Sequence, residues 1–224
     1  MGRLYSYCLR FDSGAAPNPF WGVCTLAICK PAIRRTAQVG DWVVGTGSKH
    51  SHIGDMSGKL VYAMKITSKM TMAEYDEFTK TQLPNKIPDW SNGDLRRRLG
   101  DSIYDFTTSP PNVRRGVHTI RNRQKDLSGE FVLLSEHFFY FGDKPIPLPK
   151  YVKALVKQGP GHRSRSNDRL LEPFFAWLVS LNLINNTLYG NPQFRKFKES
   201  FPEIDPAKGR CLSASCSNLS KLCC

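Results

Sequence analysis

Short apolar segments, each bounded by turn-forming residues, are the feature that most limits the fold of this chain. Residues 42–44, 59–67 and 131–141 are rich in β-branched and aromatic side chains, and glycine or aspartate lies beside each of them. Such segments predict strands joined by turns. The alternating residues 3–11 add a first strand, and residues 131–141 form two strands or one bent strand. The chain is therefore expected to be a mostly β unit.

Two other segments carry helix signals. Thr71 followed by Glu74 forms a capping box at the start of "TMAEYDEFTKT". The segment "NDRLLEPFFAWLVSLNLI" predicts a helix that begins near Asn167 or Asp168, with Pro173 in its first turn. Its apolar face comprises Leu170, Leu171, Phe174, Phe175, Leu178, Leu181 and Leu183.

The apolar run at residues 22–29 is ambiguous. It is short, and Pro31 ends any regular element after Lys30, so we expect a short helix or coil there. Residues 83–126 are rich in proline, asparagine, glycine and arginine and predict a long irregular basic insert. We expect one domain at residues 1–185 and a C-terminal extension at 186–224, whose last fifteen or so residues are poorly ordered.

Charge gives the first indication of a partner. The 224 residues include 32 Lys and Arg but 19 Asp and Glu, a formal net charge of +13. Such an excess favours a polyanion, and nucleic acid before a membrane surface, although simple solubility explains it too. No stretch approaches the roughly 20 apolar residues of a membrane helix, and the first residues lack the apolar region of a signal peptide. We expect a cytoplasmic protein.

Seven cysteines predict thiols rather than a disulfide framework. Cys8, Cys24 and Cys29 lie in apolar surroundings and are expected to be core residues. The other four cysteines lie in a Ser-rich tail with spacings that fit a zinc site poorly. We therefore expect neither a metal nor another cofactor.

Aromatic and polar side chains near the first turns suggest a site for a base. Two tryptophans are the first candidates for stacking, and amide, carboxylate and hydroxyl groups near them can read a base edge. Most aromatic rings must nevertheless fill the core. The base-binding candidates are Asn18, Phe20, Trp21, Asp41, Trp42, Thr46 and Ser48.

Basic residues provide candidate phosphate contacts. The segment "GPGHRSRSND" at residues 159–168 combines glycines, arginines and hydroxyls, which suits phosphate oxygens but also suits a charged connecting loop. The arginine-rich insert adds further positive charge. The phosphate-binding candidates are Lys30, Arg34, Arg35, Lys49, His162, Arg163, Ser164 and Arg165.

Acid and base groups leave an enzymatic alternative open. The histidines match neither a zinc protease nor a zinc deaminase motif. If the chain is an enzyme, Asp41, Glu136 and His137 are the candidate catalytic groups.

Three motifs together resemble a known family. "APNPFWGVCTLAICKPAIRRTAQVGDWVVGTGSK", "GKLVYAMKIT" and "FVLLSEHFFYFG" are similar to the nucleotide modification associated domain, type two, over about residues 4–178. A shorter pattern, Gly40-Asp41, Val43 and residues 61–66, resembles the PUA-like superfamily with its ASCH, EVE and YTH domains. The fold expected is α+β: a small PUA-like open β-barrel with flanking short helices and the basic insert.

The first family implies a place beside DNA base modification genes of bacteria or phages. We expect a module that binds a modified or flipped base in an aromatic pocket while basic residues hold phosphates. The alternatives are an enzyme that acts on a nucleotide or DNA base and a non-catalytic partner of a modification enzyme. The ligand expected is nucleic acid, with DNA favoured, or a nucleotide.

Overall fold

A mixed seven-stranded sheet forms the centre of the molecule. The structure is a computed structural model that describes residues 2–193. The four main strands are β1 (Leu4–Leu9), β3 (Trp42–Gly47), β4 (Lys59–Lys65) and β9 (His137–Tyr140). Three two-residue strands complete the sheet: β10 (Ile146–Pro147), β11 (His162–Arg163) and β12 (Thr187–Leu188). The order is β11-β1-β3-β4-β9-β12, with β10 also on β4.

A second sheet continues from the first. It comprises β2 (Cys24–Leu26), β8 (Phe131–Ser135) and β5 (Ser68–Thr71) in the order β2-β8-β5. The antiparallel register that pairs Tyr62 with Tyr140 in the first sheet continues unchanged to the pair Thr71 and Phe131 in the second. β4 with β5 and β9 with β8 therefore form one bent antiparallel ladder that passes through both sheets.

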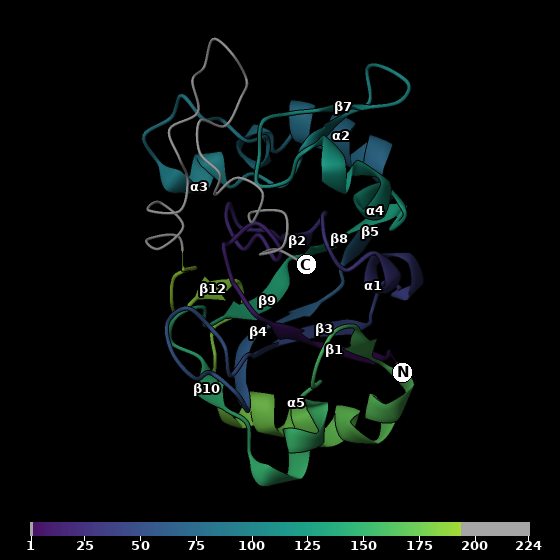
Figure 1. Cartoon of the computed structure of the whole chain (residues 1–224). Coiled ribbons are helices and arrows are strands. Elements are labelled where there is room, and N and C mark those ends of the chain that lie inside the picture. Colours follow the sequence, from purple (N-terminus) through teal and green to yellow (C-terminus); the bar gives the residue numbers. More distant parts are fainter. Residues whose placement is uncertain (1, 194–224) are drawn as a thin grey trace.

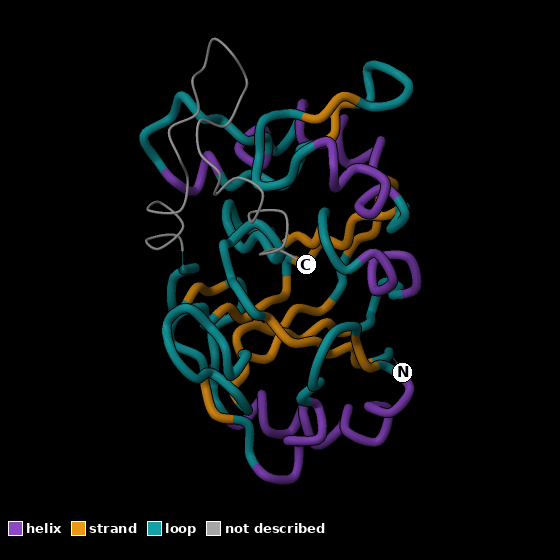
Figure 2. The backbone as a smooth tube through the Cα atoms, in the orientation of Figure 1, coloured by secondary structure: helices purple, strands orange, loops and turns teal. Residues whose placement is uncertain are grey.

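Helices cover both ends of this β structure. α5 (Leu171–Ser180) and the 3₁₀ helices Lys150–Leu155 and Arg165–Leu170 lie below the seven-stranded sheet in Figure 1. α1 (Pro31–Thr36) lies beside the sheets, and α2 (Met72–Thr81), α3 (Leu95–Arg98) and α4 (Arg123–Leu127) lie above. Figure 2 shows most strands, in orange, between these groups of purple helices.

Residues 83–126 form part of the upper layer. They contain α3, most of α4, the 3₁₀ helices Pro84–Lys86 and Ile120–Asn122, and a small antiparallel pair of β6 (Tyr104–Asp105) and β7 (Asn112–Val113). Lys86 anchors this segment. Its fully buried ammonium donates to the Asn18 and Val23 carbonyls and to the Asn18 and Thr25 side chains at 2.7–2.9 Å.

Alternation along the strands separates the two sides of the central sheet. Leu4, Trp42 and Val44 point to α5, where they join a cluster with Phe174 and Leu178. Their neighbours along the same strands point the other way, into a cluster between the two sheets that includes Tyr5, Tyr7, Val43, Tyr62 and Met64. We call these the α5 side and the inner side; the inner side extends through α1 and the second sheet to residues 83–126.

Most of the predicted elements are present. The capping box at Thr71 is confirmed, since its hydroxyl accepts from the Glu74 N–H and the Glu74 carboxylate accepts from the Thr71 N–H. The predicted apolar face of the last helix is also confirmed, because all seven of its residues pack in the α5-side cluster. The last residues of the predicted extension, and its four cysteines, lie outside the described residues.

The prediction for residues 22–29 is wrong. Cys24 to Leu26 pair with β8, and Pro31 opens a helix at its first position. Pairing with the distant strand β8 makes this run a strand, and no local sequence pattern indicates that pairing. In class, the chain is a mixed α/β protein of several sheets and short helices, and its described residues form no closed barrel.

Candidate functional site

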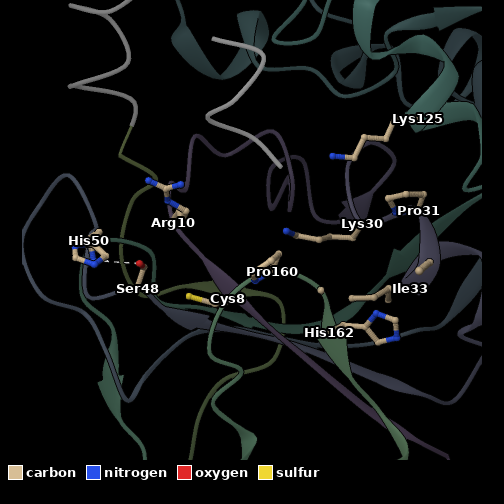
Figure 3. Close-up of a pocket in the computed structure, with 13 residues that line it drawn as sticks. Cys8, Arg10, Lys30, Pro31, Ile33, Ser48, His50, Lys125, Pro160 and His162 are labelled. Carbon is tan, nitrogen blue, oxygen red and sulfur yellow. Dashed lines mark hydrogen bonds between the residues drawn. The ribbon is translucent and has the colours of Figure 1, made fainter. Parts of the chain in front are cut away.

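A cavity of about 690 Å³ opens on the inner side of the central sheet. Five separate parts of the chain line it: the end of β1, the start of α1, the β3–β4 loop, α4 and residues 159–162 (Figure 3). The lining residues are Cys8, Arg10, Lys30, Pro31, Ala32, Ile33, Ser48, His50, Lys125, Gly159, Pro160, Gly161 and His162. Among these described residues three are cations and none is a carboxylate, so we call this space the basic cavity.

A left-handed turn places Lys30 in the cavity wall. Cys29 and Lys30 have φ angles of 57° and 41°, and Pro31 follows as the first residue of α1. Non-glycine residues in this region carry strain of about 1–3 kcal/mol each, which the surrounding structure must offset. The Lys30 ammonium lies 4.7 Å from the centre of the buried Tyr7 ring, a cation–π contact. The turn thus holds a positive charge over the sheet.

Residues 159–162 form the opposite wall. His162 pairs with Tyr7 as β11 joins the edge of β1, and its ring centre lies 5.8 Å from that of Tyr5. Burial lowers the pKa of His162 below its usual value. His162 is therefore mainly neutral at pH 7, with one ring nitrogen as donor and one as acceptor. Gly159 and Gly161 have positive φ angles that leave this backbone close to the cavity.

The β3–β4 loop closes a third side. Ser48 is buried, and its hydroxyl accepts from the His50 N–H at 3.1 Å (Figure 3). The Ser48 carbonyl accepts from the Met56 N–H, also at 3.1 Å. These bonds fix the loop so that His50 faces the cavity.

A buried thiol, imidazole and carboxylate lie close to another part of the wall, formed by Lys30 and Lys125, which respectively follow Cys29 and precede Asp126 in the chain. The Cys29 sulfur is 3.5 Å from His118 Nε2, and His118 Nδ1 is 2.5 Å from Asp126 Oδ2. Asp126 Oδ1 accepts from the Cys29 N–H at 3.0 Å, and Oδ2 also accepts from the Tyr104 hydroxyl at 2.8 Å. We call Cys29, His118 and Asp126 the buried relay.

Electrostatics within the relay favour an ionised carboxylate. Burial alone would raise the pKa of Asp126, but the hydrogen bond and charge of His118, with the Cys29 N–H and Tyr104, outweigh it and lower that pKa. Asp126 is therefore an anion that orients the imidazole. Cys29, by contrast, was expected only as a core residue, since 89 positions separate it from His118 and no spacing motif connects them.

Comparison with known families identifies the chain. The sequence model of nucleotide modification associated domain 2 matches residues 1–200. The chain belongs to this family. The first resemblance found in the sequence is thereby confirmed, whereas neither the curated proteins nor the solved structures gave a match. Within residues 2–193, no helix has the length and apolar character needed to cross a bilayer.

Three of the predicted site residues line the basic cavity: Lys30, Ser48 and His162. Arg10, His50 and Lys125 also line it but are not among the individually predicted site residues, although the insert that contains Lys125 was expected to add positive charge. Lys125 lies in the basic insert, whose sequence contains nine cations and no pattern that selects one of them. Nearby, Lys49 and Arg165 are exposed, Ser164 is half-buried, and Arg163 donates to the Ser166 hydroxyl at 3.1 Å, all outside the cavity lining.

Arg34 does not face solvent. Its side chain is fully buried and donates to the carbonyls of Cys29 and Phe131 at 2.8 Å and to that of Asp126. Burial lowers its pKa, and the nearby Asp126 charge acts against that shift. Its donors hold the start of α1 against β8 and α4. Arg35, one residue on, is exposed and donates to the Ser128 carbonyl at 2.7 Å.

Several base-binding candidates occupy structural positions. The Asn18 amide donates to the Leu99 carbonyl at 2.9 Å, and its oxygen accepts from Lys86. Thr46 is buried and donates to the Tyr7 carbonyl at 3.2 Å, and Phe20 is part of the core. Each of these groups already has its partner inside the protein.

The two tryptophans lie apart from the basic cavity. Trp42 is buried on the α5 side, 4.9 Å from the Phe175 ring centre, and lines a separate cavity of about 200 Å³. Trp21 has a left-handed φ of 67°, and the Arg96 guanidinium lies 5.1 Å from its ring centre. The two rings do not enclose a common space with Lys30.

The candidate acid and base groups make local contacts. Asp41 accepts from the backbone N–H groups of Arg3 at 2.6 Å and Gln38 at 2.8 Å, which fixes the turn before β3. Glu136 is exposed at the bend between β8 and β9. Burial, with the Lys65 charge, lowers the pKa of His137, whose ring packs edge-on against Trp42.

Proposed function

We propose that this protein binds a phosphate-bearing ligand of a nucleotide modification system in the basic cavity. The ligand is a nucleotide or a modified base presented from DNA. One observation carries the proposal: Arg10, Lys30 and Lys125 converge on one cavity, and no carboxylate lines it within residues 2–193. A volume of about 690 Å³ lies within the usual range for small-molecule sites, roughly 300–1,000 Å³.

The proposed contacts divide between the two walls. Lys30 and Lys125 neutralise phosphate oxygens, and Arg10 adds a bidentate contact. The neutral His162 donates to or accepts from the base or sugar, and Pro31, Ile33 and Pro160 give the base an apolar surface. This differs from the expected stack between Trp21 and Trp42. The expected PUA-like barrel remains part of the proposal, with the bent ladder as its wall.

A binding screen tests the proposal. Fluorescence anisotropy would compare duplex DNA carrying a panel of modified bases with unmodified duplex and with free nucleotides, at two salt concentrations. We expect discrimination among these ligands, and Lys30→Ala and Lys125→Ala should each weaken binding by about tenfold through a lost phosphate contact. Lys144→Ala removes an exposed cation outside the cavity lining and is the matched control.

Two results would contradict the proposal. Equal effects of Lys30→Ala and Lys144→Ala would mean that total charge, not the cavity, governs binding. Equal affinity for every duplex, changing only with salt, would leave a general basic binder without a base site.

A further inference from the structure

We infer that the buried relay is a catalytic site in which Cys29 is the nucleophile, His118 its general base and Asp126 a positioning residue. The substrate class is an acyl compound, an ester or amide, whose phosphate is anchored in the basic cavity. The anchoring depends on the proposed function; the reactivity of Cys29 does not.

The first argument is a contrast between two buried thiols. Cys24 and Cys29 are both fully buried and lie five residues apart. Burial raises the pKa of the Cys24 thiol to about 12, which makes it inert near neutral pH. Cys29 instead has an imidazole 3.5 Å from its sulfur and a carboxylate behind that imidazole. That order of groups is the one that activates a nucleophile in acyl transfer.

The second argument is backbone geometry. Cys29 stands between β2 and α1 in a left-handed conformation, and Lys30 repeats it. Strain of this kind gathers at functional sites, and the Cys29 N–H is held by Asp126 itself. The relay carboxylate therefore fixes both the nucleophile's backbone and the imidazole.

The third argument is position. The residues that follow Cys29, Lys30 and Pro31, line the basic cavity, as does Lys125, which precedes Asp126. Cys29 and Asp126 are therefore each bonded in the chain to a residue that lines the cavity. Cys29 itself is fully buried, so the proposed reaction requires the wall at Lys30 and Pro31 to open toward a bound ligand.

Several charged and titratable groups in the described part of the chain surround Cys29. His118 and Asp126 face it from residues 83–126, Arg34 donates to its carbonyl from α1, and Tyr104 and the buried Tyr7 lie near enough to feel its charge. A thiolate and imidazolium pair with Asp126 carries one net negative charge, which the Arg34 guanidinium offsets.

The proposed reaction has two stages. His118 accepts the Cys29 thiol proton, and the sulfur adds its electron pair to the carbonyl carbon of the substrate. The C–O or C–N bond breaks, and the leaving group departs with the proton from His118. Water then adds to the thioester carbon, the C–S bond breaks, the product leaves as a carboxylic acid, and the water's other proton restores the thiol.

Alkylation kinetics test the nucleophile directly. The full chain is treated with iodoacetamide at pH 6.5, and peptide mass spectrometry follows each cysteine separately. We expect Cys29 to react at least about tenfold faster than Cys24, the matched buried control without an imidazole. Equal rates at the two thiols would overturn the inference, whatever the cavity binds.

Variants separate catalysis from packing. His118→Gln should reduce Cys29 alkylation to the Cys24 rate, and Asp126→Asn should reduce it partly. The control is Tyr75→Phe, which removes a buried tyrosine–carboxylate hydrogen bond to Asp101 outside the relay and should change Cys29 alkylation by less than about twofold. Unchanged alkylation in a folded His118→Gln variant contradicts the relay. If that variant does not fold, the wild-type ratio of the two thiols decides.

An acyl probe tests the reaction class. With p-nitrophenyl acetate we expect a burst of p-nitrophenol and an acetylated Cys29 peptide, both absent in Cys29→Ala. Fast alkylation without acetylation would contradict the acyl class. Fast alkylation that no nucleotide slows would leave the relay standing and contradict the anchoring in the basic cavity.

Discussion

The two sides of the central sheet are buried in different ways. On the α5 side, Leu4, Trp42 and Phe174 pack among apolar neighbours, and the buried polar groups Ser6 and Asn167 bond to each other at 2.9 Å. The inner side buries ionisable groups: Asp12, Arg34, Lys86, Asp101, His118 and Asp126. An apolar core tolerates exchanges that conserve its volume, whereas a buried charge is tolerated only with fixed partners. The inner side therefore specifies geometry where the α5 side supplies stability.

Arg34→Met should give the largest effect on this comparison. It replaces a buried guanidinium by an apolar side chain and leaves the carbonyls of Cys29, Asp126 and Phe131 without their donor. We expect a loss of about 3–5 kcal/mol in the free energy of unfolding, measured by urea denaturation. Arg35→Met, on the exposed face of the same helix, is the control and should change it by less than about 0.5 kcal/mol. Similar losses in both variants would mean that the inner side does not depend on its buried partners.

Asp12 offers a pH test of the same side. Burial, countered by hydrogen bonds from Tyr140 and Gly14, raises its pKa from 3.8 to about 6. The folded state thus favours the protonated acid, so this stabilisation is complete below about pH 4 and is lost as pH rises through about 6. Between about pH 4 and pH 6, the free energy of unfolding of the wild type should fall relative to that of Asp12→Asn by about 3 kcal/mol. A difference that is constant with pH, in thermal melts, would contradict the assignment.

Trp42→Phe addresses the α5 side with a smaller expected effect. The smaller ring leaves unfilled space beside Phe175 and His137, which should cost about 2 kcal/mol in unfolding free energy. Because Trp42 lies outside the basic cavity, ligand affinity in the anisotropy assay should stay within about twofold. A marked loss of base discrimination would return Trp42 to the binding site and blur the contrast between the two sides.

Local sequence signals predicted the fold better than the site. A capping box such as Thr71 with Glu74, or the apolar face of α5, depends on neighbours within a few residues, and each formed as expected. Whether a ring or a cation is buried depends on distant strands. Trp42, Arg34 and Asn18 are residue types that suit a nucleotide site. All three are buried, however, and their side chains contact other parts of the protein.

The buried relay shows the same limit from the opposite direction. Cys29 appeared to be a plain apolar residue because its partners, His118 and Asp126, lie 89 and 97 positions away. The left-handed backbone at Cys29 and Lys30 could not be predicted either, because neither residue type favours positive φ angles. Only the fold of residues 83–126 onto the second sheet brings these groups together.

The bent ladder limits how this chain can change in length. Its register is continuous from Tyr62 with Tyr140 to Thr71 with Phe131, so one residue inserted into either strand would turn every later side chain to the opposite face. That shift would change which side chains face the core in both sheets. Insertions and deletions among relatives should therefore avoid the ladder and collect in exposed loops such as residues 52–55, and a fusion tag or engineered linker placed there has the best prospect of leaving the fold intact.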